Sequence, residues 1–275
     1  MSEKNRDGKR AAREQLKIDR EKQKAAEKRK RALIVGGAVV AVLAIAAVIG
    51  VVVSNSGGDD SSTASGPVVA PKGANGKDDL AIPVGASDAP STLTVWEDFR
   101  CPACGAFEKT FRDTIHELES SGQMKVEYHL ATLIDSNMQG SGSLRAANAA
   151  ACAQGAGKFP AYHDVLYENQ PEETNDAFAK NSYLIELAGK VDGLDTPSFQ
   201  SCVNGGTHDS WVKKSNTAFQ NSGYSGTPTV LLNGDAVFPK KGDEAITPAN
   251  LKKWVAEANK GKKAGTLTPS PGTTG

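Results

Sequence analysis

Two cysteines separated by two residues are the part of this sequence best suited to chemistry. Cys101-Pro-Ala-Cys104 follows an apolar run and precedes a helical pattern of apolar residues. A cysteine at the start of a helix meets free backbone N–H groups and the positive end of the helix dipole, which stabilise a thiolate over a thiol. Cys104, one helical turn later, is close enough to form a disulfide with it. We therefore predict a dithiol redox site in which Cys101 is the nucleophile and Cys104 is its resolving partner.

The patterns on both sides of the pair predict the elements that position it. Residues 92–99 alternate and are rich in β-branched and aromatic residues, which predicts a strand running into the first cysteine. After the second cysteine, four apolar side chains share one helical face: Phe107, Phe111, Ile115 and Leu118. Gly122 signals the end of that helix. Pro102 is tolerated in the first helical turn, where the backbone N–H groups have no partner to lose.

Two other uses of a Cys-x-x-Cys pair have to be weighed. A zinc site normally needs a second, closely spaced pair of ligands. The other cysteines, Cys152 and Cys202, lie 50 residues apart, and no spacing typical of a metal site occurs among the histidines, which are His116, His129, His163 and His208. A purely structural disulfide would close a tiny loop here and add little stability. We favour redox chemistry and expect neither a metal nor a cofactor.

The first 53 residues indicate the compartment. Residues 1–31 carry 13 Lys and Arg against 6 Asp and Glu, and residues 32–53 carry no charge. A helix over that apolar run would be about 33 Å long, enough to cross a bilayer. The run is long and is followed by a poor cleavage site, which favours a retained transmembrane signal anchor over a cleaved signal peptide. The positive-inside rule then predicts a single-pass cell-membrane protein with a cytoplasmic N-terminus and an extracytoplasmic remainder.

Composition divides the remainder into three parts. Residues 54–79 are rich in Ser, Gly, Asp, Ala and Pro, which predicts a flexible linker. Residues 80–258 are long enough for one sizeable domain, and residues 259–275 read as a disordered tail. The basic cytoplasmic arm, residues 1–31, has no aromatic residues and adjoins the predicted span. We therefore expect it to lie against membrane lipid and not to bind nucleic acid.

Within residues 80–258 the patterns predict an α/β domain. A second strand is expected at 124–131 and a third at 229–232, followed by a turn at Asn233-Gly234 and a return strand at 236–238. Between the second and third strands we expect only helices, near 143–156, 160–169, 175–190, 196–204 and 207–221. Pro248 opens a last helix.

Several stretches resemble the DsbA-like branch of the thioredoxin superfamily. They are residues 84–90, residues 97–104 with the CPAC pair, residues 145–152 and residues 226–230. The resemblance covers about residues 80–258. It implies a thioredoxin fold interrupted by a helical insertion at about 140–222. It also implies that Cys101 is the nucleophile, that Cys104 is its buried partner, and that Pro228 is a cis-proline facing them.

A cis bond before Pro228 would have a clear use. It would expose the backbone of Thr227 beside the sulfurs, where an extended substrate could pair with it irrespective of side chain. Without the resemblance, an ordinary trans proline at the start of a strand would be the default, because about one X-Pro bond in twenty is cis.

The chain departs from the family pattern at the buried acid. Thioredoxin carries this acid six residues before its first cysteine, where this chain has Val95. Glu97 lies on the same face of the strand, and Asp98 is nearer still. Either is a candidate proton acceptor for Cys104, or simply a solvated acid at the end of a strand.

The remaining two cysteines predict a structural disulfide. In a cytosolic protein Cys152 and Cys202 would be two independent buried thiols, but in an exported domain an even cysteine count favours a bridge. Closing a loop of about 50 residues would stabilise the fold by about 4 kcal/mol on the chain-entropy model.

These observations predict a membrane-anchored thiol:disulfide oxidoreductase that introduces disulfides into exported cysteine-containing proteins. By family analogy, a quinone-linked membrane protein would reoxidise it. A reductase or an isomerase would use the same two sulfurs, and the direction depends on how strongly the Cys101 thiolate is stabilised. An alternative of another class is a tethered chaperone-like binding module, which would not require an intact Cys101/Cys104 pair.

Overall fold

The computed structural model describes residues 67–267. The predicted basic arm and the predicted transmembrane anchor lie outside these residues. Of the helices between residues 67 and 267, none combines the length and the apolar character that crossing a bilayer requires.

A five-stranded sheet lies at the centre of the fold, with the strand order β1-β3-β2-β4-β5. The strands are β1 (Ile82–Val84), β2 (Ser91–Glu97), β3 (Met124–Leu130), β4 (Thr229–Leu232) and β5 (Asp235–Ala236). β2 and β3 are parallel, and the remaining pairs are antiparallel. A parallel pair needs a crossover connection, which helix α2 (Pro102–Ser120) provides. The C-terminal end of β2 therefore leads directly into the redox helix.

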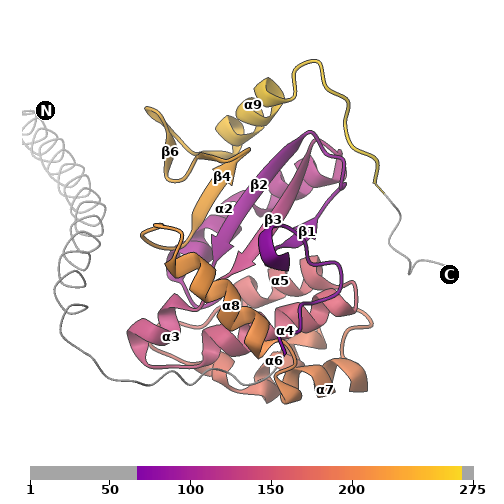
Figure 1. Ribbon diagram of the computed structural model, residues 1–275, viewed down its shortest axis with the longest axis vertical. Helices are drawn as coiled ribbons and strands as arrows, with labels where there is room; N and C mark the ends of the chain where they lie inside the picture. Colours follow the sequence, from indigo (N-terminus) through magenta and orange to yellow (C-terminus); the bar gives the residue numbers. More distant parts are fainter. Residues whose placement is uncertain (1–66, 268–275) are drawn as a thin grey trace, which may run out of the picture. The chain divides into compact units, whose positions relative to one another are not determined.

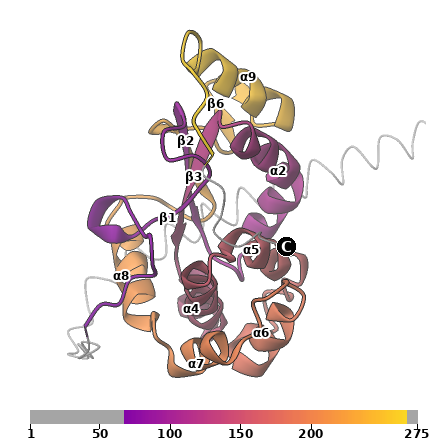
Figure 2. The same cartoon turned by 90° about the vertical axis from the view of Figure 1, so that its right-hand side faces the viewer.

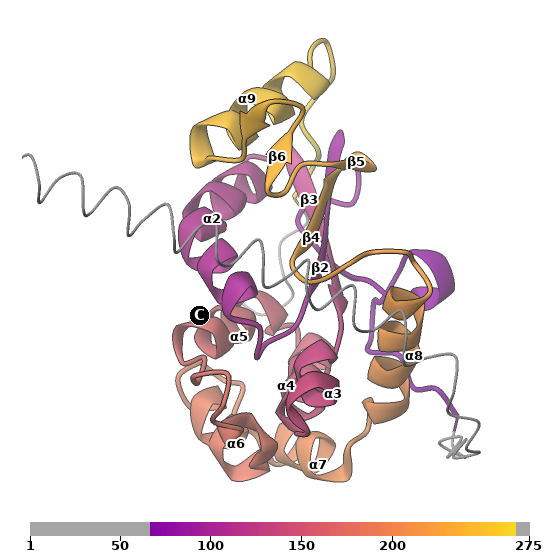
Figure 3. The same cartoon turned by 90° about the vertical axis from the view of Figure 1, so that its left-hand side faces the viewer.

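Helices cover both faces of the sheet, as the alternation of β2 requires. Figure 3 shows α2 and α9 (Pro248–Ala258) on one face and α8 (Asp209–Gln220) on the other. Leu93 and Val95 are fully buried on one side of β2. Trp96 points to the opposite side, where its ring contacts Phe219 of α8. Both faces of β2 are thus covered, as expected for the middle strand of an α/β sheet.

A block of helices separates β3 from β4 and lies at one end of the sheet (Figures 1 and 2). Its elements are α3 (Leu133–Met138), α4 (Gly142–Gly155), α5 (Phe159–Glu168), the 3₁₀ turn η2 (Ala177–Ala179), α6 (Asn181–Ala188), α7 (Pro197–Gly205) and α8. We call residues 133–220 the helical insertion. Its central helix, α4, is rich in buried alanines, which allow the neighbouring helices to approach closely. A disulfide between Cys152 and Cys202 joins α4 to α7.

The structure adds elements that the sequence patterns did not predict. β1 and α3 are short, and a small hairpin formed by β6 (Lys240–Lys241) and β7 (Glu244–Ala245) carries no apolar alternation. The helix expected over 175–190 is divided between η2 and α6. The return strand is Asp235–Ala236 and its pairing continues only to the N–H of Val237, because Pro239 has no N–H to extend the ladder.

The segments expected to be a free linker and a free tail pack on the domain where the structure describes them. Val69 O accepts a hydrogen bond of 2.7 Å from His208 Nδ1, and Asp79 O accepts one of 2.7 Å from Trp211 Nε1. Beyond α9, Gly265 N donates to Gly122 O at 2.8 Å. These contacts use backbone groups, which every residue carries, so a polar composition did not reveal them. The packed domain therefore extends beyond residues 80–258 in both directions.

Candidate active site

Cys101 and Cys104 lie at the start of α2, just after the C-terminal end of β2. Cys101 is the N-cap of α2, and its carbonyl accepts the first intrahelical hydrogen bond, from Gly105 N at 3.1 Å. Pro102 occupies the first helical position, as expected. Both cysteines are thiols in this structure, and their exposures differ: Cys101 is 7% exposed and Cys104 is 1% exposed. Only the first sulfur is within reach of a substrate.

The pKa values of the two thiols are displaced in opposite directions. The pKa of Cys101 is lowered to about 6, chiefly by the hydrogen bond from the Cys104 thiol and against the effect of burial. Thr227 and the N–H groups of Ala103 and Cys104 lower it further. Burial raises the pKa of Cys104 well above its ordinary value, and the neighbouring Cys101 sulfur raises it more. At neutral pH the pair thus consists of a thiolate at Cys101 and a thiol at Cys104.

The loop before β4 faces Cys101. The peptide bond between Thr227 and Pro228 is cis. When Cys101 is protonated, its Sγ donates a hydrogen bond to Thr227 O at 3.3 Å. Thr229 Oγ1 donates to Gly226 O at 2.7 Å across the same turn. Thr227 is only half-buried. Its backbone carbonyl lies directly beside the reactive sulfur.

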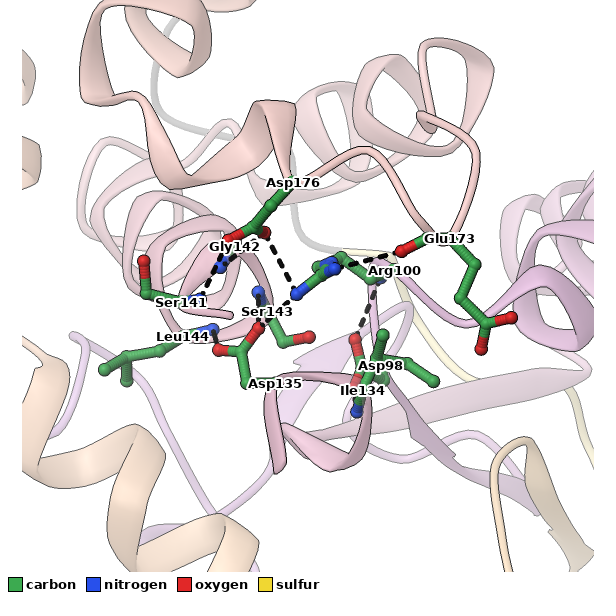
Figure 4. Close-up of polar contacts among 10 residues, drawn as sticks. All are labelled: Asp98, Arg100, Ile134, Asp135, Ser141, Gly142, Ser143, Leu144, Glu173 and Asp176. Carbon is green, nitrogen blue, oxygen red and sulfur yellow. Dashed lines mark hydrogen bonds and ion pairs between the residues drawn. The ribbon is translucent and has the colours of Figure 1, made fainter. Parts of the chain in front are cut away.

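Both candidate proton acceptors are buried, so the reading of a solvated acid at the strand end is wrong. Glu97 is 1% exposed and Asp98 is 0% exposed. Asp98 accepts hydrogen bonds of 2.9 Å from the N–H groups of Arg100 and Ile134 (Figure 4). Burial raises the pKa of Asp98 to about 7, although both amide hydrogen bonds lower it. Glu97 has a different partner, because its Oε1 lies 2.9 Å from His163 Nε2.

Two further members of this buried group, His163 and Glu108, were not predicted from the sequence. His163 comes from α5, 66 residues after Glu97, and only the tertiary fold brings the two together. Burial alone would lower the pKa of His163, but the surrounding carboxyl groups raise it well above its ordinary value. Glu108 lies one turn after Cys104 on α2, and burial raises its pKa to about 8. An i, i+4 relation to Cys104 was visible in the sequence, but nothing there indicated that Glu108 is buried.

Two groups of side chains have the composition of metal ligands among residues 67–267. Donor atoms of Glu97, Glu108 and His163 lie within 4.8 Å of one another in the core. The second group is Cys152, Cys202 and His208. Its two sulfurs are bonded to each other, which leaves no thiolate to bind a metal.

A comparison with known protein families agrees with this geometry. A family model described as Thioredoxin matches residues 77–257. The chain belongs to the thioredoxin family. Within that family it is DsbA-like, a thiol:disulfide oxidoreductase with the Cys101–Cys104 pair at its centre.

Solved structures support the assignment to this branch. The reduced form of a disulfide bond oxidoreductase (DsbG) from Mycobacterium tuberculosis is 30% identical, with a TM-score of 0.56, and the match covers 67% of this chain and 89% of that one. Reduced DsbA from the same organism is 29% identical, with a TM-score of 0.55, and the match covers 65% of this chain and 92% of that one. The similarity therefore spans the sheet, the redox helix and the helical insertion together.

Relatives identified by sequence include two kinds of protein. Disulfide bond formation protein D from Bacillus subtilis (strain 168) is 25% identical over 157 residues, which are 56% of this chain and 68% of that protein. The serine/threonine-protein kinase PknE from Mycobacterium tuberculosis (strain ATCC 25618 / H37Rv) is 29% identical over 157 residues, 54% of this chain. The match covers only 27% of the kinase.

Proposed function

We propose that this protein is a membrane-anchored, extracytoplasmic oxidoreductase that introduces disulfides into exported cysteine-containing proteins. The observation that carries the proposal is the asymmetry of the redox pair. Cys101 keeps 7% exposure and its pKa is about 6, whereas Cys104 is 1% exposed and its pKa is raised. Stabilising the Cys101 thiolate stabilises the reduced form, and this makes the disulfide form an oxidant.

The reaction consists of two thiol–disulfide exchanges. A substrate thiolate attacks Cys101 Sγ, the bond to Cys104 Sγ breaks, and the Cys104 sulfur leaves and takes up a proton. The substrate's second thiolate then attacks the substrate's first sulfur in the mixed disulfide. The bond from that sulfur to Cys101 Sγ breaks, and Cys101 leaves as a thiolate. The substrate loses two electrons and the Cys101–Cys104 pair gains them. Thr227, before cis-Pro228, would pair with the extended backbone of the substrate during both steps.

A buried Cys104 needs a nearby group with which to exchange its proton. Glu97 and Asp98 both remain candidates in this proposal. The pKa of Asp98, about 7, lets its carboxyl group take or release a proton at neutral pH. The Glu97 carboxylate is held by His163, 2.9 Å away, in the core beneath the redox helix.

The proposed location rests on the sequence, and the proposed reoxidising partner rests on analogy with the family. The apolar run at residues 32–53 would anchor the chain, with residues 1–31 against the cytoplasmic lipid surface. A quinone-linked membrane protein would reoxidise the dithiol, by analogy with the family. In this oxidising compartment the Cys152–Cys202 disulfide would act as a structural bridge. Protease added to intact cells should cleave after Ser54 and spare Lys9–Arg31, and release of an intact domain with a new N-terminus near residue 55 would contradict the anchor.

The central experiment compares three proteins in oxidation of a reduced substrate and in reduction of insulin. Wild-type residues 54–275 should be active in oxidation, Cys101→Ser should be inactive in both assays, and Cys152→Ser should retain oxidation. A chaperone-like binding module would be favoured by two results together: the wild type shows no exchange activity, and Cys101→Ser binds unfolded substrate as well as the wild type does. Insulin reduction without substrate oxidation would favour the reductase or isomerase.

A further inference from the structure

Arg100, the residue before the reactive cysteine, is buried and points away from it into the helical insertion. Its side chain is 2% exposed. Nη1 lies 2.8 Å from Asp135 Oδ1 and 3.0 Å from Asp176 Oδ1, and Nη2 donates to Glu173 O at 3.0 Å (Figure 4). A single guanidinium group therefore ties the active-site turn to two separate segments of the insertion.

The two carboxylates that hold Arg100 are themselves fixed by the start of α4. Asp135 accepts hydrogen bonds of 2.8 and 2.9 Å, and Asp176 accepts two of 3.0 Å. The four donors are consecutive N–H groups: Ser141, Gly142, Ser143 and Leu144. These are the amides that a helix cannot pair internally, and they favour negative charge. Figure 4 shows both aspartates between this helix start and Arg100.

The backbone around the guanidinium leaves no space for side chains. A Cβ added at Gly140 would lie 2.2 Å from Arg100 Nη1, and one added at Gly142 would lie 2.2 Å from Asp176 Oδ1. The arginine, the two aspartates and the start of α4 therefore form one closely fitted unit.

The turn that carries Arg100 also depends on the insertion for its backbone hydrogen bonds. Gln170 Nε2 donates to Phe99 O at 3.0 Å and to Cys101 O at 2.8 Å. Asp98 reaches Ile134 N at the start of α3. Residues 98–101 are thus held mainly from the insertion side, and the position of Cys101 Sγ against Thr227 depends on these contacts.

We propose that Arg100 is a positioning residue for thiol–disulfide exchange, because it locks the 98–101 turn to the start of α4 and so holds Cys101 against Thr227 and the free N–H groups of α2. The inference deepens the proposed function and rests on it. Thiolate formation at Cys101 can be measured without a substrate, however, so a failed activity assay and a failed positioning role give different results.

The test uses two measurements on the full-length protein. The first is the pKa of Cys101, measured in the reduced protein from the ultraviolet absorbance of its thiolate, and the second is the reduction potential of the Cys101–Cys104 pair. Arg100→Gln should raise the pKa of Cys101 by about one unit. At a pH below the wild-type pKa, the variant should therefore contain about tenfold less Cys101 thiolate than the wild type. The potential should become more reducing in the same variant. Arg100→Lys keeps the charge but loses the two-pronged geometry, and it should give a smaller change in the same direction.

Arg112 offers a matched control on the redox helix. It also binds the insertion through two carboxylates, Asp164 and Glu168, but it lies away from the 98–101 turn. Arg112→Gln should leave the Cys101 pKa and the potential unchanged. An equal shift in Arg112→Gln, or no shift in a folded Arg100→Gln, would overturn the proposal. If Arg100→Gln does not fold, Arg100→Lys and Asp176→Asn decide it by the same two measurements, and unchanged values in both would overturn it.

Discussion

The two sulfurs of the redox pair differ because one caps a helix and the other lies one turn inside it. Cys101 receives the hydrogen bond from Cys104 and the first N–H groups of α2, and its pKa falls to about 6. We expect alkylation of Cys101 in the reduced protein to be half-maximal near pH 6, with Cys104 unreactive below neutral pH. Cys104→Ala removes the largest stabilising contact, so the pKa of Cys101 should rise. Rate profiles against pH measure both, and a wild-type midpoint near that of a free cysteine would contradict this reading.

The same pKa predicts how stability depends on pH. The pKa of Cys101 is lower in the folded protein, about 6, than in the unfolded chain, about 9. The Cys101 thiolate therefore stabilises the reduced protein fully above pH 9, and this contribution is lost as the pH falls through about 6. The free energy of unfolding of the dithiol form, relative to the disulfide form, should therefore fall between pH 9 and pH 6.

The second of the two residues between the cysteines, Ala103, predicts how far the pair can be made more oxidising. Ala103 is exposed and adds no charge or side-chain donor beside Cys101. Ala103→His should lower the pKa of Cys101 and raise the reduction potential with the fold unchanged, because a histidine can donate a hydrogen bond or carry positive charge. Redox equilibration with glutathione, followed by mass spectrometry, measures the change. An unchanged potential would show that the helix start alone determines the poise.

Glu108 provides a second pH test. Burial raises its pKa to about 8, so it costs folding free energy increasingly as the pH rises from about 4.5, where the unfolded carboxyl ionises, to about 8. Glu108→Gln should gain stability relative to the wild type across this window, by up to a few kcal/mol. Glu117→Gln, at an exposed position of the same helix, is the control and should follow the wild-type curve. Denaturation at pH 5 and pH 8 measures this difference in the free energy of unfolding. If the difference between Glu108→Gln and wild type is the same at both pH values, the raised pKa of Glu108 is contradicted.

At this scale the sequence predicted the groups that act through local structure. Cys101, Cys104 and the N-terminal position of Pro102 follow from a strand that runs into a helix. The burial of Glu97 and Asp98 did not follow, because the helical insertion covers the end of β2 and supplies His163 and the amide of Ile134. Charge alone favoured neither a solvated nor a buried acid.

At the scale of elements, long periodic segments were predicted and short ones were missed. The redox helix, β2, β3, β4 and most helices of the insertion match their predicted ranges within a few residues. Three elements have too few residues to show a period: β1, α3 and the β6–β7 hairpin. β1 is positioned by its pairing with β3, α3 by its contacts with α4, and the two strands of the hairpin by their pairing with one another. The buried alanines of α4 allow neighbouring helices to approach closely, and α4 lies at the centre of the insertion.

The disulfide between α4 and α7 is the element-scale prediction. Its loop spans 50 residues, for which the chain-entropy model gives a stabilisation of about 4 kcal/mol. The double variant Cys152→Ser/Cys202→Ser should lose about 2–4 kcal/mol in the free energy of unfolding while keeping the Cys101 pKa of the wild type. Urea denaturation and thiolate absorbance provide the two measurements. Loss of exchange activity in a still-folded double variant would assign these cysteines to the reaction instead.

At the scale of the whole molecule, composition indicated an anchor and one domain, and the structure extends that domain. Residues 67–79 pack on α8 and residues 260–267 pack near the α2–β3 turn, through backbone groups that composition does not reveal. The arrangement makes the end of β2, the helical insertion and the loop before β4 parts of one site. All three meet at Cys101, through Thr227 and Gln170.

The reduction potential of the Cys101–Cys104 pair tests the central claim most directly. A Cys101 thiolate stabilised in the reduced form predicts a potential well above that of thioredoxin, about −270 mV. Because Ala103 adds no donor, the potential should remain below that of DsbA, about −120 mV. Equilibration of the full-length protein with glutathione buffers measures it. A value at or below that of thioredoxin would contradict the assignment as an oxidant and would identify the protein as a reductase.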